Sequence, residues 1–405
     1  QIVTNEDEVI SIEEFKLDVD KTYPNVASMK ADTELTDGQL VQTESYWDKQ
    51  YGGSAYYDIV SSTSLTVDEG KCIQLDNALY AELHPINDTV TVNQFGAYGD
   101  GEHDDAGAIQ LAWNAGYDNV TFESEKYMTD NIITLQKSNV NIIGNQTTIS
   151  MRDEFNIPIN YFIYVTGTED NPLNNINLYN LSIETGKVVR SFNDAVQLMV
   201  RYVNGLEISG CNFSVSQDID NHVTNIWMNG STSNATIYDN NFINLSNSDA
   251  GGNIWITEQT DNITKNIKIY NNYIEKSSHD ESIAIWHGNV EDIVINNNTF
   301  NIHEENVENP SDVNFTIGND EEDSVFNVKF TNNKIDTQTK RMIFSISSPS
   351  NKENEILIEN NHINCTFVQK MGDISLFNNK TENNNFLVNN NNINISAKYE
   401  DDEFF

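Results

Sequence analysis

The chain has 405 residues and a formal net charge of −40, with 62 acidic and 22 basic side chains. Such a surface repels polyanions, which argues against nucleic acid and against an anionic membrane surface as partners. No apolar run approaches the ~20 residues that span a bilayer, and the hydrophobic content of 38% suits a fold whose outward side chains are polar.

Residues 1–20 are acidic and have no clear period, and a small β-rich domain is predicted to follow. The pair Asp37-Gly38 predicts a hairpin turn before a strand at 40–43, and residues 55–60 read as another strand. The aromatic cluster around Tyr46 and Trp47 either binds a sugar or forms the core of the small domain, and the core is favoured because aromatic residues dominate such cores.

The three cysteines are far apart in the sequence, at positions 72, 211 and 365. An odd, sparse set argues against a disulfide framework and lacks the spacing of a metal site. We expect buried thiols, and we expect neither a metal nor another cofactor.

Residues 89–118 predict a strand, a Gly-Asp-Gly turn and an amphipathic helix. Asp104 or Asp105 can cap the N-terminus of that helix. A helix placed across the open end of a solenoid would cover its first core layer and its unpaired backbone edge. The predicted apolar face comprises Ala108, Leu111, Ala112 and Ala115.

From residue 119 to the end, a short phrase recurs in which an apolar residue precedes Asn pairs and a second apolar residue closes the unit. The closing residues stand at positions 149, 183, 213, 242, 274, 300, 335, 363 and 393. A spacing near 30 residues indicates a solenoid, and period-2 alternation with many β-branched residues indicates strands. The framework of a leucine-rich repeat is missing, and phased apolar residues argue against a disordered Asn-rich tail. The pattern therefore predicts a parallel β-helix, with Asn in left-handed turns and its amides stacked in ladders.

The segment from Val92 to Asp105, with Phe95-Gly96-Ala97 and Gly99-Asp100-Gly101, resembles the phrase that opens the pectate-lyase-like right-handed β-helix superfamily. Residues 23–85 resemble the head segment of phage and prophage tailspike depolymerases. The resemblance implies an all-β, right-handed parallel β-helix with a small N-terminal β-rich head and a capping helix. It also implies a homotrimer, a location on a virion tail or outside the cell, and a structural role for the aspartates of the opening segment. The expected domains are 1–88, 89–118 and 119–405.

One strand series places tryptophans on the outside of consecutive coils. If the isoleucines and the methionine of segments 225–229, 253–257 and 282–287 fill the core, alternation points the residues between them outward. An outward aromatic patch marks a binding site or a subunit contact, and we expect it to bind a glycan in preference to forming a trimer interface. The outward residues would be Trp227, Trp255, Ala284 and Trp286, with His287 as a further sugar contact.

Acidic residues flank these tryptophans, as a glycoside hydrolase requires, because one carboxylic acid protonates the leaving oxygen and a second carboxylate activates water or attacks the sugar. Segment 280–285 resembles the paired-acid strand of polygalacturonase-type hydrolases, although the glycine–histidine–glycine and arginine–isoleucine–lysine motifs of that family are missing. The candidate catalytic residues are Asp249, Glu258, Asp280 and Glu281.

The sequence thus predicts a polysaccharide depolymerase, a glycoside hydrolase that cleaves a bacterial capsular, exopolysaccharide or wall glycan. Two alternatives stay open. A polysaccharide lyase would need a cation to neutralise a uronate carboxylate, and the basic residues near the groove are Lys187, Arg190 and Arg201. A non-enzymatic glycan-binding adhesin would use the tryptophans alone.

Overall fold

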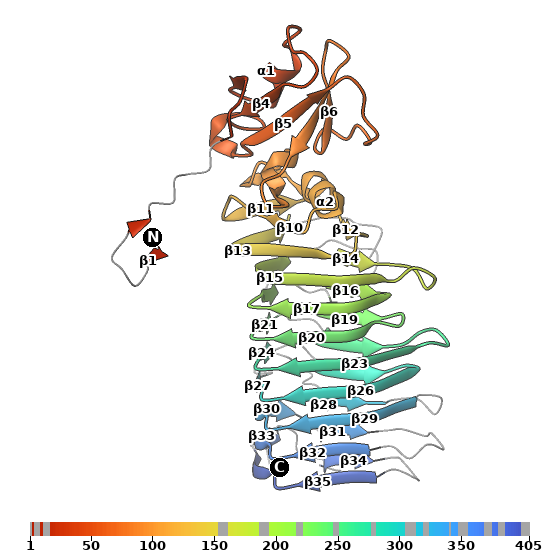
Figure 1. Cartoon of the computed structure of the whole chain (residues 1–405). Coiled ribbons are helices and arrows are strands. Elements are labelled where there is room, and N and C mark those ends of the chain that lie inside the picture. The colour runs from red at the N-terminus through yellow and green to blue at the C-terminus, as the bar shows by residue number, and fades with distance from the viewer. Residues whose placement is uncertain are drawn as a thin grey trace.

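The computed structural model (Figure 1) shows a small head joined to a long stack of coils. The two α-helices, α1 (Val26–Lys30) and α2 (Ala106–Asn114), are short, and no helix in the described part of the chain is long and apolar enough to cross a membrane. The structure describes residues 2–3, 9–10, 17–152, 161–185, 194–215, 222–245, 251–276, 281–303, 313–318, 324–339, 342–346, 355–367, 375–379 and 385–397.

The head is a five-stranded sheet with α1 and a 3-10 turn, Lys49–Tyr51, at its side. The strand at 55–60 was predicted correctly, but the hairpin at Asp37-Gly38 was not. The strand at 40–43 pairs in parallel with an earlier strand, and the turn itself is held against β5 by a bond from Gly38 N to Ile59 O (2.8 Å). In sheet order the strands are β3 (Lys21–Tyr23), β4 (Leu40–Thr43), β5 (Ala55–Val60), β7 (Tyr80–His84) and β6 (Cys72–Gln74). Ahead of the head, β1 (Ile2–Val3) pairs antiparallel with β2 (Val9–Ile10).

The solenoid opens with β8 (Thr89–Thr91), a 3-10 turn (Val92–Phe95) and β9 (Asp100–Asp104), and α2 then lies over the first coil. Two side chains of α2 satisfy the backbone edge of β12 (Ile133–Leu135). Gln110 accepts from Thr134 N (2.8 Å), and Asn114 donates to Thr134 O (2.7 Å). The predicted capping role of this helix is therefore confirmed, because it covers an edge that has no strand partner.

The predicted apolar face of α2 was correct at Ala112 and at the partly buried Ala108 and Ala115, but it was wrong at Leu111. The buried residues are Ala106, Ile109, Ala112 and Trp113, while Leu111 is 39% exposed. The helix is rotated because its amide side chains must face β12. Asp105 occupies the N-cap position, but its carboxylate accepts from the backbone of Tyr98 (2.6 Å) and Gly99 (3.2 Å) and so fixes the Gly-Asp-Gly turn.

Each coil contributes strands to three parallel series, and the long strands β13 (Val140–Met151) and β15 (Leu173–Thr185) each belong to the first two. The first series also contains β10 (Asn119–Thr121), β17 (Val203–Ser209), β20 (Ser233–Tyr238), β23 (Ile263–Tyr270), β26 (Asn289–Asn296), β29 (Ser324–Thr331), β32 (Glu355–Glu359) and β35 (Asn385–Asn389). The second also contains β11 (Lys126–Thr129), β18 (Asn212–Val215), β21 (Asn241–Asn244), β24 (Tyr273–Lys276), β27 (Thr299–Ile302), β30 (Lys334–Thr339), β33 (His362–Phe367) and β36 (Asn392–Ala397).

The third series is a separate nine-stranded sheet. Its strands are β12, β14 (Tyr161–Thr166), β16 (Asp194–Arg201), β19 (His222–Asn229), β22 (Ile254–Thr257), β25 (Ile283–Trp286), β28 (Val313–Ile317), β31 (Met342–Ile346) and β34 (Ser375–Asn379). The predicted parallel β-helix is confirmed. The nine closing apolar residues of the repeat, from Ile149 to Ile393, form one continuous column of register partners in the second series.

A buried asparagine ladder separates the first two series. Asn298 is typical, because its Oδ1 accepts from both the backbone and the amide of Asn272 (2.9 and 3.0 Å), and its own amide donates to Asn333 Oδ1 (3.1 Å) and Ile269 O (2.9 Å). The residue before each ladder asparagine has positive φ, near 55°, as predicted for left-handed turns. The ladder comprises Asn240, Asn272, Asn298, Asn333, Asn361 and Asn391. The three cysteines are buried thiols, as predicted.

We expect Asn298→Ala to lower the free energy of unfolding by about 2–4 kcal/mol, because the change removes the side-chain partners of Asn272 N and Ile269 O in the preceding coil and of the Asn333 amide oxygen in the next one. Asn301→Ala, on the outward side of β27 in the same coil, is the matched control and should stay within ~0.5 kcal/mol of the parent. Denaturant unfolding followed by circular dichroism measures both, and equal losses for the two variants would contradict a special role for the ladder.

Burial raises the pKa of the Asp105 carboxyl to about 6, and the neighbouring Asp100 and Asp104 add to the shift, against the two backbone donors, which lower it. The folded state therefore holds a proton that the unfolded chain has already released, so the stability that this group provides falls as pH rises from about 4 through 6. Thermal unfolding of the parent and Asp105→Asn between about pH 4 and 7 should show a smaller decline of stability with pH for the variant. Parallel curves would contradict the assignment.

Candidate functional site

The outer face of the nine-stranded sheet carries an aromatic column. Trp227 pairs in register with Trp255, and the column continues upstream through Met199 to Tyr164. Downstream, Trp255 is opposite Ala284, while Trp286 lies two residues further along β25, opposite Thr257. The sequence pattern therefore predicted correctly which side of the strands these residues occupy, but not that Trp286 is offset from the other two.

The three tryptophans, here called the tryptophan strip, pack against one another edge to face. The ring centroids of Trp227 and Trp255 are 5.5 Å apart with planes at 77°, and those of Trp255 and Trp286 are 5.8 Å apart at 68°. Trp227 Nε1 donates to Thr257 Oγ1 (2.8 Å), and the His287 ring lies 4.9 Å from that of Trp286. The three half-buried rings form a herringbone that presents alternating ring faces and edges along the sheet.

Ala284 corrects one expectation, because it is fully buried although it belongs to the outward column. Because its side chain is a single methyl group, the outward column has little bulk at this position beside Trp255. Gly252 has a similar effect, since a Cβ at that position would clash with the carbonyl oxygen of Glu281 and lie 2.6 Å from Trp255 Nε1. The edge of the Trp255 indole thus lies close to the backbone of Gly252, where there is no side chain. Among the described residues, its Nε1 has no acceptor.

Glu281 lies beside the tryptophan strip. It lies two residues before the first residue of β25, and its Oε1 accepts a hydrogen bond from Thr316 Oγ1 (2.7 Å). Thr316 is the register partner of Ala284 and therefore lies two coils beyond Trp255 in the same column. Glu281 is partly exposed as a residue, although its Oε2 atom is buried, so the structure places one predicted carboxylate beside the face that carries the tryptophans with little of the carboxylate open to solvent.

Glu258 does not fit its predicted catalytic role. It is 1% exposed, and its two carboxylate oxygens accept from Ser231 N (2.6 Å), Thr264 Oγ1 (2.9 Å), and both the backbone and the hydroxyl of Thr260 (2.9 and 2.6 Å). Four donors occupy both oxygens, so a substrate has no access to them. Glu258 instead fastens the turn after β22 to the preceding coil.

Two other predicted catalytic residues, Asp249 and Asp280, lie outside the described residues, as do Lys187 and Arg190. Arg201 is described, and its guanidinium stacks over the ring of Tyr202 (4.9 Å) at the end of β16. Within the described ranges, no group of three or more His, Cys, Asp or Glu side chains is placed to hold a metal ion.

Sequence reasoning missed the upstream end of the aromatic face. Tyr161 and Tyr164 of β14 lie 5.0 Å apart between ring centroids and are partly exposed. The signal was present, because Tyr164 alternates with the buried Ile163 and Val165 as Trp227 does with its neighbours. This coil contains no tryptophan, the residue type by which the other outward positions were identified.

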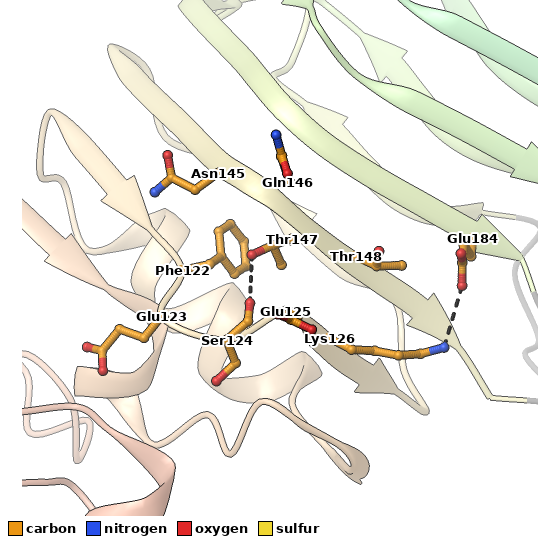
Figure 2. Close-up of a pocket in the computed structure, with 10 residues that line it drawn as sticks. All are labelled: Phe122, Glu123, Ser124, Glu125, Lys126, Asn145, Gln146, Thr147, Thr148 and Glu184. Atoms are coloured by element: carbon orange, nitrogen blue, oxygen red, sulfur yellow. Dashed lines mark hydrogen bonds and ion pairs between the residues drawn. The ribbon is translucent and has the colours of Figure 1, made fainter.

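Sequence reasoning also missed a shallow groove along the first coils of the second series (Figure 2), with adjoining hollows of about 520 and 570 Å³. Both hollows are lined by Lys126 and Glu184, whose Nζ and Oε2 atoms are 3.5 Å apart. Both side chains are about half exposed, so the pair contributes at most ~1 kcal/mol. Arg152, in the second hollow, pairs with Asp130 (2.6 Å). The groove depends on how successive coils stack, which no single repeat reveals.

No protein-family model and no curated protein matches the sequence. The solved structures that share the fold include two phage tailspike proteins. Tailspike protein 2 of the Escherichia coli O157:H7 bacteriophage CAB120 aligns with a TM-score of 0.59 and 14% identity over 93% of this chain and 51% of its own. The tailspike protein of Acinetobacter baumannii phage AM24 aligns with a TM-score of 0.53 and 13% identity over 92% of this chain and 64% of its own.

The chain therefore spans between half and two thirds of the length of these tailspike proteins. At 13–14% identity the likeness is one of fold, and it confirms that this chain shares the parallel β-helix of phage tailspikes, as the opening segment led us to expect.

Gly252→Ala should lower the free energy of unfolding by about 1–3 kcal/mol and change the tryptophan fluorescence spectrum, because the added methyl group displaces either Trp255 or the next strand. Gly107→Ala on α2 is the control, since nothing lies within 4 Å of its new Cβ. A helical Gly→Ala change stabilises by about 0.5–1 kcal/mol. An unchanged spectrum and unfolding curve for Gly252→Ala would show that Trp255 is not held in this way.

Proposed function

We propose that this chain is a tailspike-type polysaccharide depolymerase, a glycoside hydrolase that acts on a bacterial surface glycan. The observation that carries the proposal is the placement of Glu281 beside the tryptophan strip on one face of the nine-stranded sheet. Aromatic rings supply apolar contact area for the faces of a pyranose, and a neighbouring carboxylate supplies acid–base or nucleophilic chemistry.

The geometry of the coils suits a linear polymer. Neighbouring coils are separated by the ~4.8 Å spacing of paired strands, so Trp227, Trp255 and Trp286 offer contacts at intervals along the axis of the stack. The net charge of −40 favours a neutral or cationic glycan over a polyanionic one. His287, exposed at the end of the strip, adds a polar contact for sugar hydroxyls.

Hydrolysis needs a second carboxylate besides Glu281, one group serving as the general acid and the other as the nucleophile or the base for water. We assign that partner role to Asp280 or Asp249. What supports a role for Glu281 is its hydrogen bond from Thr316, the register partner of Ala284, which holds the carboxylate in one position. Glu258 has no part in this scheme, because its oxygens are occupied in the interior.

The same fold similarity supports a place on a virion tail and a homotrimeric assembly, which we propose together with the activity. A trimer contact across the tryptophan strip is the competing use of this surface, since interfaces are rich in tryptophan. A lyase is the competing chemistry, and the observation in its favour is that Arg201 lies on the same sheet as the tryptophans.

The test is incubation with a panel of purified bacterial capsular, exopolysaccharide and wall glycans, while reducing ends and ultraviolet-absorbing unsaturated products are followed together. We expect reducing ends without ultraviolet absorbance. Glu281→Gln should lower kcat at least ~100-fold, the lower bound for loss of a general acid or base. Trp255→Ala should weaken binding of the cleaved glycan.

Glu275→Gln is the matched control, because Glu275 lies on β24 of the second series and bonds Tyr273 (3.2 Å), away from the strip. It should retain activity and melting temperature. Ultraviolet-absorbing products would identify a lyase, and binding without cleavage would identify an adhesin. Loss of the trimer in Trp255→Ala, measured by light scattering, would assign the strip to subunit contact.

A further inference from the structure

A second aromatic cluster lies at the junction of the head and the solenoid, far along the chain from the tryptophan strip. Trp47 and Tyr51 come from the head, whereas Tyr98 and His103 come from the opening segment of the solenoid. The rings of Trp47 and Tyr98 are nearly parallel, with centroids 5.3 Å apart and planes at 7°, and His103 stacks on the other side of Tyr98 at 4.1 Å. Tyr51 closes the side of the stack, perpendicular to Tyr98 at 5.0 Å.

The protein holds these rings in place without a ligand. Trp47 Nε1 donates to Gly96 O (2.8 Å), and the edge of the Trp47 ring packs against Tyr46 at 4.9 Å. Asp100 accepts from the backbone of His103 (3.0 Å) and pairs with its Nδ1 (2.7 Å). A site fixed in this way loses little side-chain entropy on binding.

A hollow of about 280 Å³ opens beside the stack, with Trp47, Tyr51 and Tyr98 as its aromatic walls and Asn25 and Asp48 at its rim. Trp47 is 41% exposed, and Asp48 is exposed, with no capping bond from its side chain to the 3-10 turn that it precedes. The volume is close to the lower end of the range for small-molecule sites.

Packing between head and solenoid does not account for this arrangement, because other contacts already join the two parts. Gln94 Nε2 donates to Ser54 O (2.8 Å), and Glu123 accepts from Gly53 N (2.9 Å). A ring that served packing alone would be covered, as the Tyr46 ring is at 7% exposure. Trp47 instead keeps a large exposed surface beside a concave, partly polar site.

We propose that this hollow binds one neutral sugar ring, the pyranose of a glycan that the rest of the molecule also contacts. The apolar face of a pyranose matches an indole platform, and its hydroxyls can donate to Asp48 and accept from the Asn25 amide. The carboxylates of Asp48 and Asp100 disfavour uronic acids and sulfated sugars. The site serves retention of the polymer, so it does not depend on whether the tryptophan strip cleaves it.

Saturation-transfer difference NMR with the methyl glycosides of glucose, galactose, mannose and N-acetylglucosamine tests this. We expect a signal from at least one of the four with the full chain, its loss in Trp47→Ala, and at least about tenfold weaker binding in Asp48→Ala, equivalent to ~1.4 kcal/mol. All measurements are made in the Trp255→Ala background, so that the tryptophan strip contributes less to the signal, and Glu275→Gln in that background is the matched control because it lies away from both aromatic sites.

Asp48 is exposed, so Asp48→Ala should fold normally and still tests the site if Trp47→Ala does not fold. Melting temperatures are measured for all three variants. Absence of a signal from all four glycosides, or a signal that survives both Trp47→Ala and Asp48→Ala, would overturn the proposal. A change of oligomeric state in Asp48→Ala without sugar binding would overturn it in favour of contact between copies of the chain. Hydrolytic activity does not enter these readouts, so failure here and failure of the proposed hydrolase are distinguishable.

Discussion

The buried hydrogen bond between asparagine amides of successive coils is the constraint on which the rest of the solenoid depends. Each ladder residue binds the coil before it, the coil after it and a backbone carbonyl at once, so a shift of one residue would leave several buried groups without partners. The strand register that is fixed at this turn also determines the register of the strands in the third series, because the same coils contribute to both. The alignment of Trp227 with Trp255 follows from it, as does the position of Thr316 beside Ala284.

The surfaces that could bind a ligand arise where the repeat is broken. Ala284 and Gly252 lack the bulk of their neighbours, and their small size gives room to Trp255 and to the backbone of Glu281. The junction cluster has no repeat at all, since Trp47 and Tyr98 come from different structural units. The repeated positions thus form the regular stack of coils, and the positions that depart from the repeat form its concave and aromatic surface features.

Local pattern predicted those features that each repeat determines by itself. Alternation identified the core column that ends in Ile393 and the outward side of Trp227. The surroundings of a side chain that depend on several coils could not be predicted from alternation. Glu258 looked like a catalyst because its donors, such as Ser231 and Thr264, are distant in sequence. The face of α2 was misjudged for a related reason, since the edge of β12 determines its rotation.

The sameness of the ladder affects the order in which the chain assembles. Each ladder asparagine bonds to another asparagine in the next coil, whichever coil it belongs to. The ladder therefore distinguishes correct from shifted residues within a coil, but it does not distinguish one coil from the next. Skipping a whole coil is therefore opposed mainly by features that differ between coils, such as the stacked Phe213–Phe242 and Tyr238–Tyr270 pairs. The capped end under α2 differs from every other layer, so the coil that packs against it has one defined place.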